Sequence, residues 1–414
     1  MKRYETYKDS GVQWLGEIPS HWELRRAKNV VKLITDKVSN SSLKKVALEN
    51  IESATGKFIE SESDFMGDGV EFKIDDILFG KLRPYLAKVY KAEFCGQSVG
   101  DIYVLRTKDE YTSDYIKFLL LSNTYISVID SSTYGAKMPR ANWDFISNVP
   151  MCVPPIKEQE NIVAFLDEKT AEIDGLVEQV EREIELLKEY KQAEIAHVVT
   201  HGLNPNAPMK PSGISWIGDI PEHWSTRKIK FTFTERSEKN HPDEPVLCAT
   251  QSQGVIPQSM YDNRVVVVNK GFENLKFVKV GDFVISLRSF QGGIEYAHYQ
   301  GIISAAYTVL TPNATIYPGY ARLLMKSHDF IQLLKTCVTG IREGQNINYD
   351  LLKNKFIPIP PLAEQQEIVD YIDRKTTEID RLVVELTYQV EYLKEYKQRL
   401  IADVVTGKIN VQQN

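Results

Sequence analysis

Two segments of the chain carry apolar residues at every seventh position. In 362–408 these are Ile372, Ile379, Leu386, Leu393 and Leu400, and in 156–201 they are Leu166, Ile173, Val180 and Leu187. This spacing predicts two helices that pair along an apolar seam, each about 60 Å long at 1.5 Å per residue. A Pro-Pro pair precedes each segment, and Gly202 or Gly407 follows it, which is typical of helix boundaries.

Much of the sequence occurs twice. Residues 10–22 and 212–224 are identical at 8 of 13 positions, and residues 154–174 and 360–380 at 12 of 21. The hexapeptide LKEYKQ occurs in both predicted helices, as Leu187–Gln192 and as Leu393–Gln398. The offsets of 202 and 206 residues are far longer than the repeat of a solenoid protein, so the chain is predicted to be a duplicated two-part module.

Between the shared segments lie two dissimilar stretches, 23–153 and 225–359, each the size of one domain. Because the flanking segments are alike and the stretches between them differ, we predict two sites of one kind with different specificities. Simple duplication of the sequence followed by drift is the alternative. The expected parts are a first domain at 1–153, a helix at 154–201, a linker with the repeated opening at 202–224, a second domain at 225–359, a helix at 360–408 and a tail at 409–414.

We therefore predict an α+β fold with a pseudo-twofold repeat, in which two globular α/β domains are separated by an antiparallel intramolecular coiled coil. Residues 202–224 must bring the chain into the second domain before the second helix begins. An arrangement with the two domains at opposite ends of the helix pair is the simplest that satisfies this order. The helix pair would then set the distance between the domains.

The composition is that of a globular protein, with 43% hydrophobic and 26% charged residues. No apolar run approaches the ~18–20 residues that span a bilayer, and the start of the chain has no apolar signal-peptide core. We expect a cytoplasmic protein. The four cysteines lie far apart without a CxxC pair, so we expect four buried thiols at Cys95, Cys152, Cys248 and Cys337.

The charge distribution qualifies the acidic average. A net charge of −6 argues against nucleic-acid binding, for which a strongly basic domain is usual. The two predicted helices carry −10 between them, which leaves +4 for the rest of the chain. The globular parts are therefore mildly basic, which permits DNA binding by those parts.

Motifs for catalysis are absent from the sequence. There is no GxxxxGK[ST] phosphate loop, no [DN]PP[YF] element of an amino-methyltransferase and no GxSxG nucleophile turn. His197 and His201 are four residues apart on a predicted helix, but no third metal ligand accompanies them. We expect no catalytic residue, no metal site and no cofactor in this chain.

Residues suited to recognition are better represented. After an apolar strand the first domain has Lys81, Arg83, Tyr85 and Lys88, and the second has Arg288, Ser289 and Gln291 at the equivalent place; closer to the helices lie Lys137 and Arg140, and Arg342, Gln345 and Asn346. Arg and Lys can bind guanine or phosphate, and Gln and Asn can pair with adenine. Solvated charges on a hairpin are the alternative. The Asn-aromatic-Asp that follows in both domains, at 142–144 and 348–350, predicts a turn and helix cap.

The duplicated WxGxIPxHW openings, PPxxEQxxIV and KTxEID helix starts and LKEYKQ hexapeptides resemble those of specificity subunits of type I restriction-modification systems, over essentially the whole chain. The resemblance implies that the dissimilar stretches are target recognition domains, each reading one half of a bipartite asymmetric sequence in double-stranded DNA. It implies that the helices fix the spacer and bind two modification subunits. Those subunits would bring S-adenosylmethionine, while restriction subunits would supply ATP- and Mg-dependent translocation and cleavage.

Two functions of other classes remain as alternatives. One is a stand-alone DNA-binding regulator, which would bind its target tightly without a modification subunit. The other is a coiled-coil scaffold that contacts only proteins and has no sequence preference for DNA.

Overall fold

The computed structural model describes residues 2–39, 42–61, 67–133, 138–261, 271–287, 289–339 and 346–412. The chain divides into two compact units. The first unit comprises residues 1–181 and 387–414, and the second comprises residues 182–386. Each unit therefore contains one of the dissimilar stretches together with part of each long helix.

Two four-stranded sheets form the first unit. One has the order β4-β11-β8-β9 (Val31–Ile34, Ile102–Thr107, Ile77–Gly80, Val89–Lys91), and the other has the order β5-β7-β10-β6 (Lys37–Val38, Gly69–Phe72, Gly96–Ser98, Lys45–Val46). Two-stranded ladders join β1 (Tyr7–Asp9) to β2 (Glu17–Pro19) and β3 (Glu23–Arg26) to β12 (Pro150–Val153). The shorter helices are α1 (Ala27–Val30), α2 (Ser113–Leu121), α3 (Asn123–Ser131) and α4 (Trp143–Ile146), with 3-10 turns η1 (Leu48–Asn50) and η2 (Pro84–Leu86).

The second unit repeats the first four-stranded sheet. Its order is β16-β23-β20-β21 (Phe233–Arg236, Thr308–Pro312, Phe283–Ile285, Glu295–Tyr296). The ladders are β13-β14 (Met209–Ile214, Gly218–Pro221), β15-β26 (Ser225–Lys228, Phe356–Ile359), β17-β18 (Leu247–Thr250, Gly254–Pro257), β19-β22 (Lys276–Val278, Gly301–Ile303) and β24-β25 (Val338–Thr339, Asn346–Ile347). Its helices are α6 (Ser289–Gly292), α7 (Pro318–Lys326), α8 (His328–Lys335) and α9 (Tyr349–Leu352), with η3 (Ile229–Phe231), η4 (Gln258–Met260) and η5 (Phe272–Asn274).

Strands β8 and β20 occupy corresponding places in the two sheets. Each is paired on one side with the strand that leads into the helical part of its unit, β11 or β23. Every residue of both strands is buried, as their apolar sequences require. The segments after these strands, which begin at Lys81 and at Ser286, are therefore equivalent, and this prediction is confirmed.

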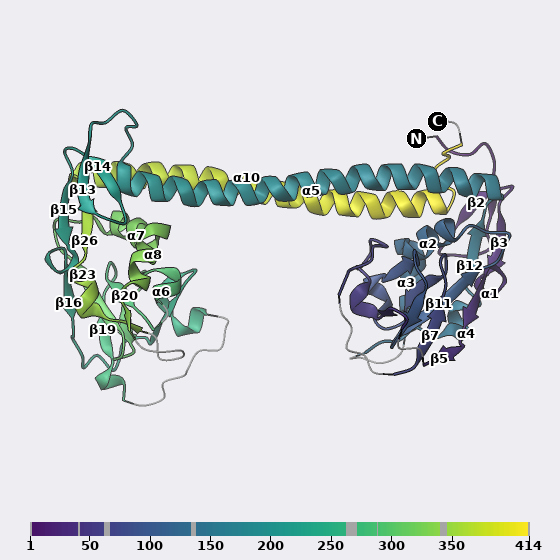
Figure 1. Cartoon of the computed structure of the whole chain (residues 1–414), viewed down its shortest axis with the longest axis horizontal. Coiled ribbons are helices and arrows are strands. Elements are labelled where there is room, and N and C mark those ends of the chain that lie inside the picture. The colour runs from purple at the N-terminus through teal and green to yellow at the C-terminus, as the bar shows by residue number, and fades with distance from the viewer. Residues whose placement is uncertain are drawn as a thin grey trace. The chain divides into compact units, whose positions relative to one another are not determined.

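The two long helices are α5 (Ile156–His201) and α10 (Leu362–Val405), as the heptad pattern predicts. Each ends at a glycine with positive φ, 80° at Gly202 and 75° at Gly407. In each unit the two helices lie side by side (Figure 1). The antiparallel pairing that we predicted is present in both units, because residues early in one helix contact residues late in the other.

The repeated helix motifs bind one another crosswise. In the first unit Lys397 Nζ lies 2.6 Å from Asp174 Oδ1, and in the second Lys191 Nζ lies 2.6 Å from Asp380 Oδ1. Both aspartates end a KTxEID motif and both lysines belong to LKEYKQ. The two motifs therefore fix the antiparallel register of the helices within each unit. Where the domains lie along the helix pair stays a prediction.

The ends of the long helices are part of the domain cores. In the second unit Val198 and Val199 of α5 and Ile368 and Ile372 of α10 are buried in one cluster with Trp224 and the residues of α7 and α8. In Figure 1, α7 and α8 lie beside the helix pair and next to β20. Burial of this kind stabilises the docking of each helix end by about 1.5–3 kcal/mol per large apolar side chain.

The thiols differ in part from expectation. Cys152, Cys248 and Cys337 are buried, and burial raises the pKa of Cys152 to about 12. The prediction is wrong for Cys95, which is exposed. Cys95 directly precedes β10 at the end of a turn, where its side chain is not enclosed by the sheets.

Candidate nucleic-acid interface

The two segments of the first unit that we predicted to bind DNA lie next to each other. Leu82 and Arg140 form an antiparallel backbone bridge, and the Arg83 N–H donates to the Pro139 carbonyl at 2.8 Å. The first segment follows β8 and the second precedes α4, so the segments are far apart in sequence. The sheet therefore brings the two sets of basic residues to one place.

Asp101 connects the basic side chains of these segments. Arg140 donates to both of its carboxylate oxygens, Nε at 3.1 Å and Nη2 at 3.0 Å, and Lys81 Nζ lies 3.7 Å from Oδ1. The hydrogen bonds from Arg140, with the charge of Lys81, lower the pKa of Asp101. Lys81 Nζ also lies 5.3 Å from the centre of the Tyr103 ring. The guanidinium of Arg140 is thus held in a fixed orientation while about half of its side chain stays exposed.

Arg83 and Tyr85 lie in a tight turn beside this cluster. Arg83 has φ 51° and ψ 64°, and Ala87 at the other end of η2 is also left-handed, with φ 46°. The side chains of Arg83 and Tyr85 are exposed, and Tyr85 exposes 54% of its surface. The turn presents a cation and an aromatic ring to solvent, which are suited to phosphate contact and to apolar contact with bases.

Lys88 has a different environment from the other predicted residues. Its ammonium donates to the carbonyls of Leu48 and Ile51 at 2.6 and 2.7 Å. Burial lowers its pKa. Lys88 therefore links the end of the 81–88 segment to η1 by hydrogen bonds, and its N–H donors point into the domain.

The second unit places different residue types at the equivalent surface. Gln291 is exposed on α6, and Asn346 is exposed on β25, which contacts α6. Ser289 is buried and its hydroxyl accepts from the Ser286 N–H at 2.8 Å, which ties the start of α6 to the residue that follows β20. Four further predicted residues lie outside the described part of the chain: Lys137, Arg288, Arg342 and Gln345.

Two residues near these surfaces were missed in the sequence. Asp101 follows β10 by three residues and shows no motif that links it to Lys81 or Arg140. In the second unit Lys326 donates to the Gly292 carbonyl at 2.8 Å and to buried Glu295 at 2.7 Å, which fastens the end of α6. Neither partner can be found from spacing, because each contact joins segments that only the fold brings together.

The repeated Asn-aromatic-Asp is a helix cap, as predicted. Asn142 Oδ1 accepts from the Asp144 N–H at 2.9 Å at the start of α4. Asn348 Oδ1 accepts from the Asp350 N–H at 3.0 Å at the start of α9. The residues that differ between the units therefore precede a cap that is the same in both.

In each unit a glutamate joins the shared opening to the helix start. Glu158 accepts from Trp22 Nε1 at 3.0 Å and pairs with His21 Nε2 at 2.8 Å, and Tyr4 also donates to it. In the second unit Glu364 accepts from Trp224 in the same way, at 3.0 Å. The HW and PPxxEQ motifs are thus two halves of one structural junction.

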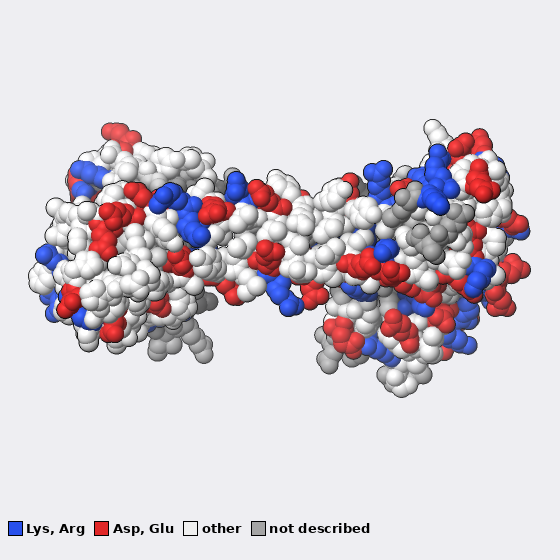
Figure 2. Space-filling view, turned by 90° about the horizontal axis from the view of Figure 1, so that it is seen from above, with Lys and Arg blue, Asp and Glu red and all other residues white. Residues whose placement is uncertain are grey.

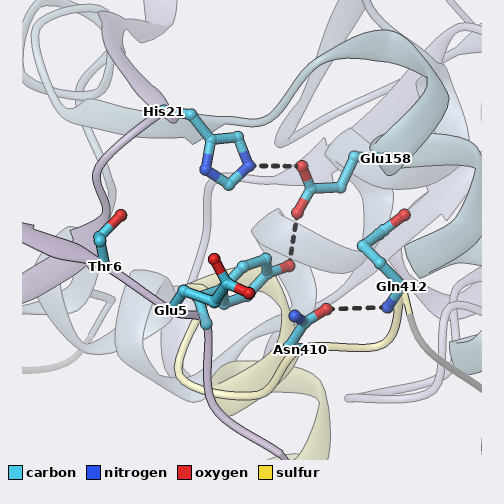
Figure 3. Close-up of a pocket in the computed structure, with 7 residues that line it drawn as sticks. Glu5, Thr6, His21, Glu158, Asn410 and Gln412 are labelled. Atoms are coloured by element: carbon cyan, nitrogen blue, oxygen red, sulfur yellow. Dashed lines mark hydrogen bonds and ion pairs between the residues drawn. The ribbon is translucent and has the colours of Figure 1, made fainter.

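Figure 3 shows a polar pocket of about 270 Å³ at this junction in the first unit. His21 and Glu158 point toward one another across it, and Asn410 and Gln412 of the C-terminal tail form part of its wall. Burial and the contact with Glu158 raise the pKa of Tyr4. The hydrogen bonds of Tyr4, His21 and Trp22 to Glu158 join the beginning of the chain to the start of α5.

Within the described ranges, no group of three or more His, Cys, Asp or Glu side chains is arranged to hold a metal ion. His197 and His201 stack on each other, with ring centres 4.8 Å apart.

Among the residues that the structure describes, no helix is long and apolar enough to cross a membrane. On the face shown in Figure 2, acidic and basic side chains are interspersed in both units.

Comparison with known proteins identifies the family. Residues 19–186 and 212–391 match the type I restriction modification DNA specificity domain. The chain belongs to this family. It is 23% identical over 95% of its length to the type I restriction enzyme MjaVIII specificity subunit of Methanocaldococcus jannaschii, covering 94% of that protein. The family match supports the DNA-recognition function and favours neither the regulator nor the protein scaffold.

Two solved structures share the fold. The HsdS subunit from Thermoanaerobacter tengcongensis has a TM-score of 0.56 and 19% identity, over 95% of this chain and 98% of that one. A chain from a study of complex assembly and conformational transition of the type I R-M system has a TM-score of 0.69 and 17% identity, over 95% of this chain and 99% of that one. The predicted fold class, two mixed domains joined by long helices, is confirmed.

Proposed function

We propose that this chain is the DNA sequence-recognition subunit of a type I restriction-modification complex and that it reads a bipartite asymmetric target with one domain per half-site. The observation that carries the proposal is the contrast between the two units. Their junctions, their caps and the order of one four-stranded sheet correspond, but the exposed side chains at the equivalent places differ. Among the described residues these are Arg83, Tyr85 and Arg140 in the first unit and Gln291 and Asn346 in the second. One scaffold with two different recognition surfaces suits a target whose two halves differ.

The first unit is suited to a half-site that contains guanine. Arg140, held by Asp101, and Arg83 on its turn can donate to guanine O6 and N7 or to phosphate oxygens. Lys81 adds a third cation, and Tyr85 adds an exposed ring beside them. Lys137 belongs to the same proposed surface by its position in the sequence, next to Met138 and Arg140.

The second unit is suited to a half-site read in part by amides. Gln291 and Asn346 can each pair with adenine N6 and N7. Arg288, Arg342 and Gln345 complete the proposed set by their positions next to these two residues in the sequence. Because α6 is fastened at both ends, Gln291 is presented from a fixed turn.

The chain itself performs no reaction in this proposal. Two modification subunits would bind it and methylate adenine with S-adenosylmethionine, and restriction subunits would use ATP and Mg²⁺. Exposed apolar side chains on the helices support a protein contact in the first unit: Tyr388 and Tyr392 on α10 expose 66% and 67% of their surface, and Leu176 on α5 exposes 50%.

The test is to express the chain with the modification subunit encoded beside it and to map adenine methylation across the host genome by single-molecule sequencing. The proposal predicts one gapped, asymmetric motif that is methylated in both halves. If the subunits purify together but no motif is methylated, sequence recognition by this chain is refuted. Arg140→Ala should then weaken or relax recognition in one half of the motif only, with Lys157→Ala, on the exposed face at the start of α5, as the matched control.

A further inference from the structure

A basic motif follows the shared opening in both units, although the surrounding residues differ. Starting at the third residue after His-Trp, and at an offset of 202 residues, both units have basic residues at the same three positions: Arg25, Arg26 and Lys28 in the first unit, and Arg227, Lys228 and Lys230 in the second. These residues lie at the end of β3 and the start of α1, and at the end of β15 and the start of η3.

Both copies are held by the same backbone contacts. The Lys28 N–H donates to the Ser147 carbonyl at 2.9 Å, and the Lys230 N–H donates to the Lys353 carbonyl at 3.0 Å. Ser147 follows α4 directly and Lys353 follows α9 directly. The two units therefore present this motif in the same local setting.

The motif is charged and largely unpaired. Within the described ranges, Arg26 and Lys28 in the first unit have no carboxylate partner, and nor do Lys228 and Lys230 in the second. Arg25 differs, because it pairs with Glu23 at 2.6 Å. These four cations therefore leave their charge available to an anionic partner.

The motif lies one short helix away from the recognition surface. In the first unit Arg140 precedes α4, and Asn148, which follows α4, accepts from Lys28 Nζ at 3.1 Å. In the second unit Asn346 precedes α9, and Lys353 follows it. A DNA duplex that contacts the recognition residues would therefore pass close to the motif in either unit.

We propose that this repeated basic motif binds the phosphate backbone of DNA beside each half-site, without reading its sequence. The reason is the contrast with the recognition residues. Side chains that read bases must differ between two different half-sites, whereas the backbone is chemically the same in both and can be bound by the same residues. This inference rests on the proposed function and adds to it a sequence-independent part of the affinity.

The expected signature is the salt dependence of binding. Each phosphate contact releases counterions and adds about 0.9 to the slope of log affinity against log salt concentration. A variant with Arg26→Gln, Lys28→Gln, Lys228→Gln and Lys230→Gln should therefore lower the slope by about 3 to 4. Its affinity should fall by about tenfold or more for every duplex, because phosphate contacts do not depend on sequence.

The experiment uses the full chain in complex with its modification subunit and measures the binding of two labelled duplexes, one with the methylated motif and one with a scrambled sequence, from about 50 to 200 mM salt. A control variant, Lys157→Gln with Lys188→Gln, removes two exposed lysines of α5. It is compared with Arg26→Gln with Lys28→Gln, which removes the same charge. Thermal unfolding checks that each variant is folded.

The proposal predicts that only the motif variants lose slope, that both duplexes weaken by the same factor and that the methylated motif is unchanged. It is overturned if slope and affinity match the control variant. It is also overturned if the modification subunit no longer co-purifies, which would make the motif a protein contact, or if only the target duplex weakens, which would make it a base-reading element. Absence of any methylated motif with the unaltered chain would instead refute the proposed function.

Discussion

The crossed ion pairs between the long helices should contribute unequally to the stability of the two units. In the first unit the side chains of Lys397 and Asp174 are 10% and 31% exposed, whereas in the second those of Lys191 and Asp380 are 24% and 62% exposed. Removing one partner of a fully buried pair costs about 3–5 kcal/mol, and an exposed pair contributes about 0.2–1 kcal/mol. Asp174→Ala leaves the nearly buried Lys397 ammonium without its acid, so we expect a cost of about 2–3 kcal/mol.

The matched variants should cost less. Asp380→Ala leaves a more exposed ammonium and should cost about 1 kcal/mol or less. Lys397→Met keeps the apolar stem and leaves Asp174 paired with Lys57 at 3.1 Å, so it should cost less than Asp174→Ala. Burial and the remaining Asp174–Lys57 pair thus make Asp174→Ala the most costly of the three, whatever the absolute scale.

Hydrogen exchange resolved by segment measures these costs separately in each unit. A loss of about 2 kcal/mol corresponds to about 30-fold less protection in the segments 156–181 and 387–405. The reasoning is refuted if Asp380→Ala lowers protection in its own unit as much as Asp174→Ala does in the first, or if Lys397→Met is the most damaging of the three.

The same pair should show a pH dependence. The ion pairs with Lys397 and Lys57 lower the pKa of Asp174 against the opposing effect of its partial burial. A carboxyl whose pKa is lowered by folding stabilises the folded state above its ordinary pKa, and this stabilisation is lost as the pH falls through the lowered value. The difference in protection between the unaltered chain and Asp174→Ala should therefore shrink in acid, and a difference that grows in acid would contradict the assignment.

Two further substitutions test other parts of the structure. Gly407→Ala and Gly202→Ala both place a Cβ at positive φ, which costs about 1–2 kcal/mol. At position 407 that Cβ would also lie 2.3 Å from Pro19 Cδ, so Gly407→Ala should lower the thermal stability of its unit more than Gly202→Ala does. Equal losses of thermal stability would contradict the packing. Burial raises the pKa of Glu295 to about 6, so this carboxyl makes the second unit less stable as the pH rises from about 4.5 to 6. In denaturant titrations Glu295→Gln should remove this fall of the unfolding free energy with pH. An unchanged dependence on pH would contradict the assignment to Glu295.

The long helices could be predicted because their signals are local. The heptad positions, the preceding prolines and the following glycines all lie within the segments that they define, and the observed bounds agree with them. The partners of the repeated motifs could not be predicted in the same way. Asp174 and Lys397 are 223 residues apart, and nothing in the sequence of either motif indicates that the two are in contact.

The recognition surfaces could be predicted only in outline. The two candidate segments of the first unit could be picked out by residue type, but that they lie side by side is known only from the backbone bridge between Leu82 and Arg140. The role of Asp101 did not, because a lone aspartate in a turn has no pattern. Nothing in the sequence distinguishes Lys88, which binds backbone carbonyls, from Lys81, which lies at the surface, since only the packing of η1 decides between them.

The central claim is that each domain reads its own half of one target. The most direct measurement replaces residues 23–153 with the corresponding stretch of a specificity subunit that recognises a different sequence, and maps adenine methylation by single-molecule sequencing. The account predicts that one half of the motif changes to the donor's sequence and that the other half is retained. A chimera that purifies with the modification subunit but changes both halves, or neither, would contradict it.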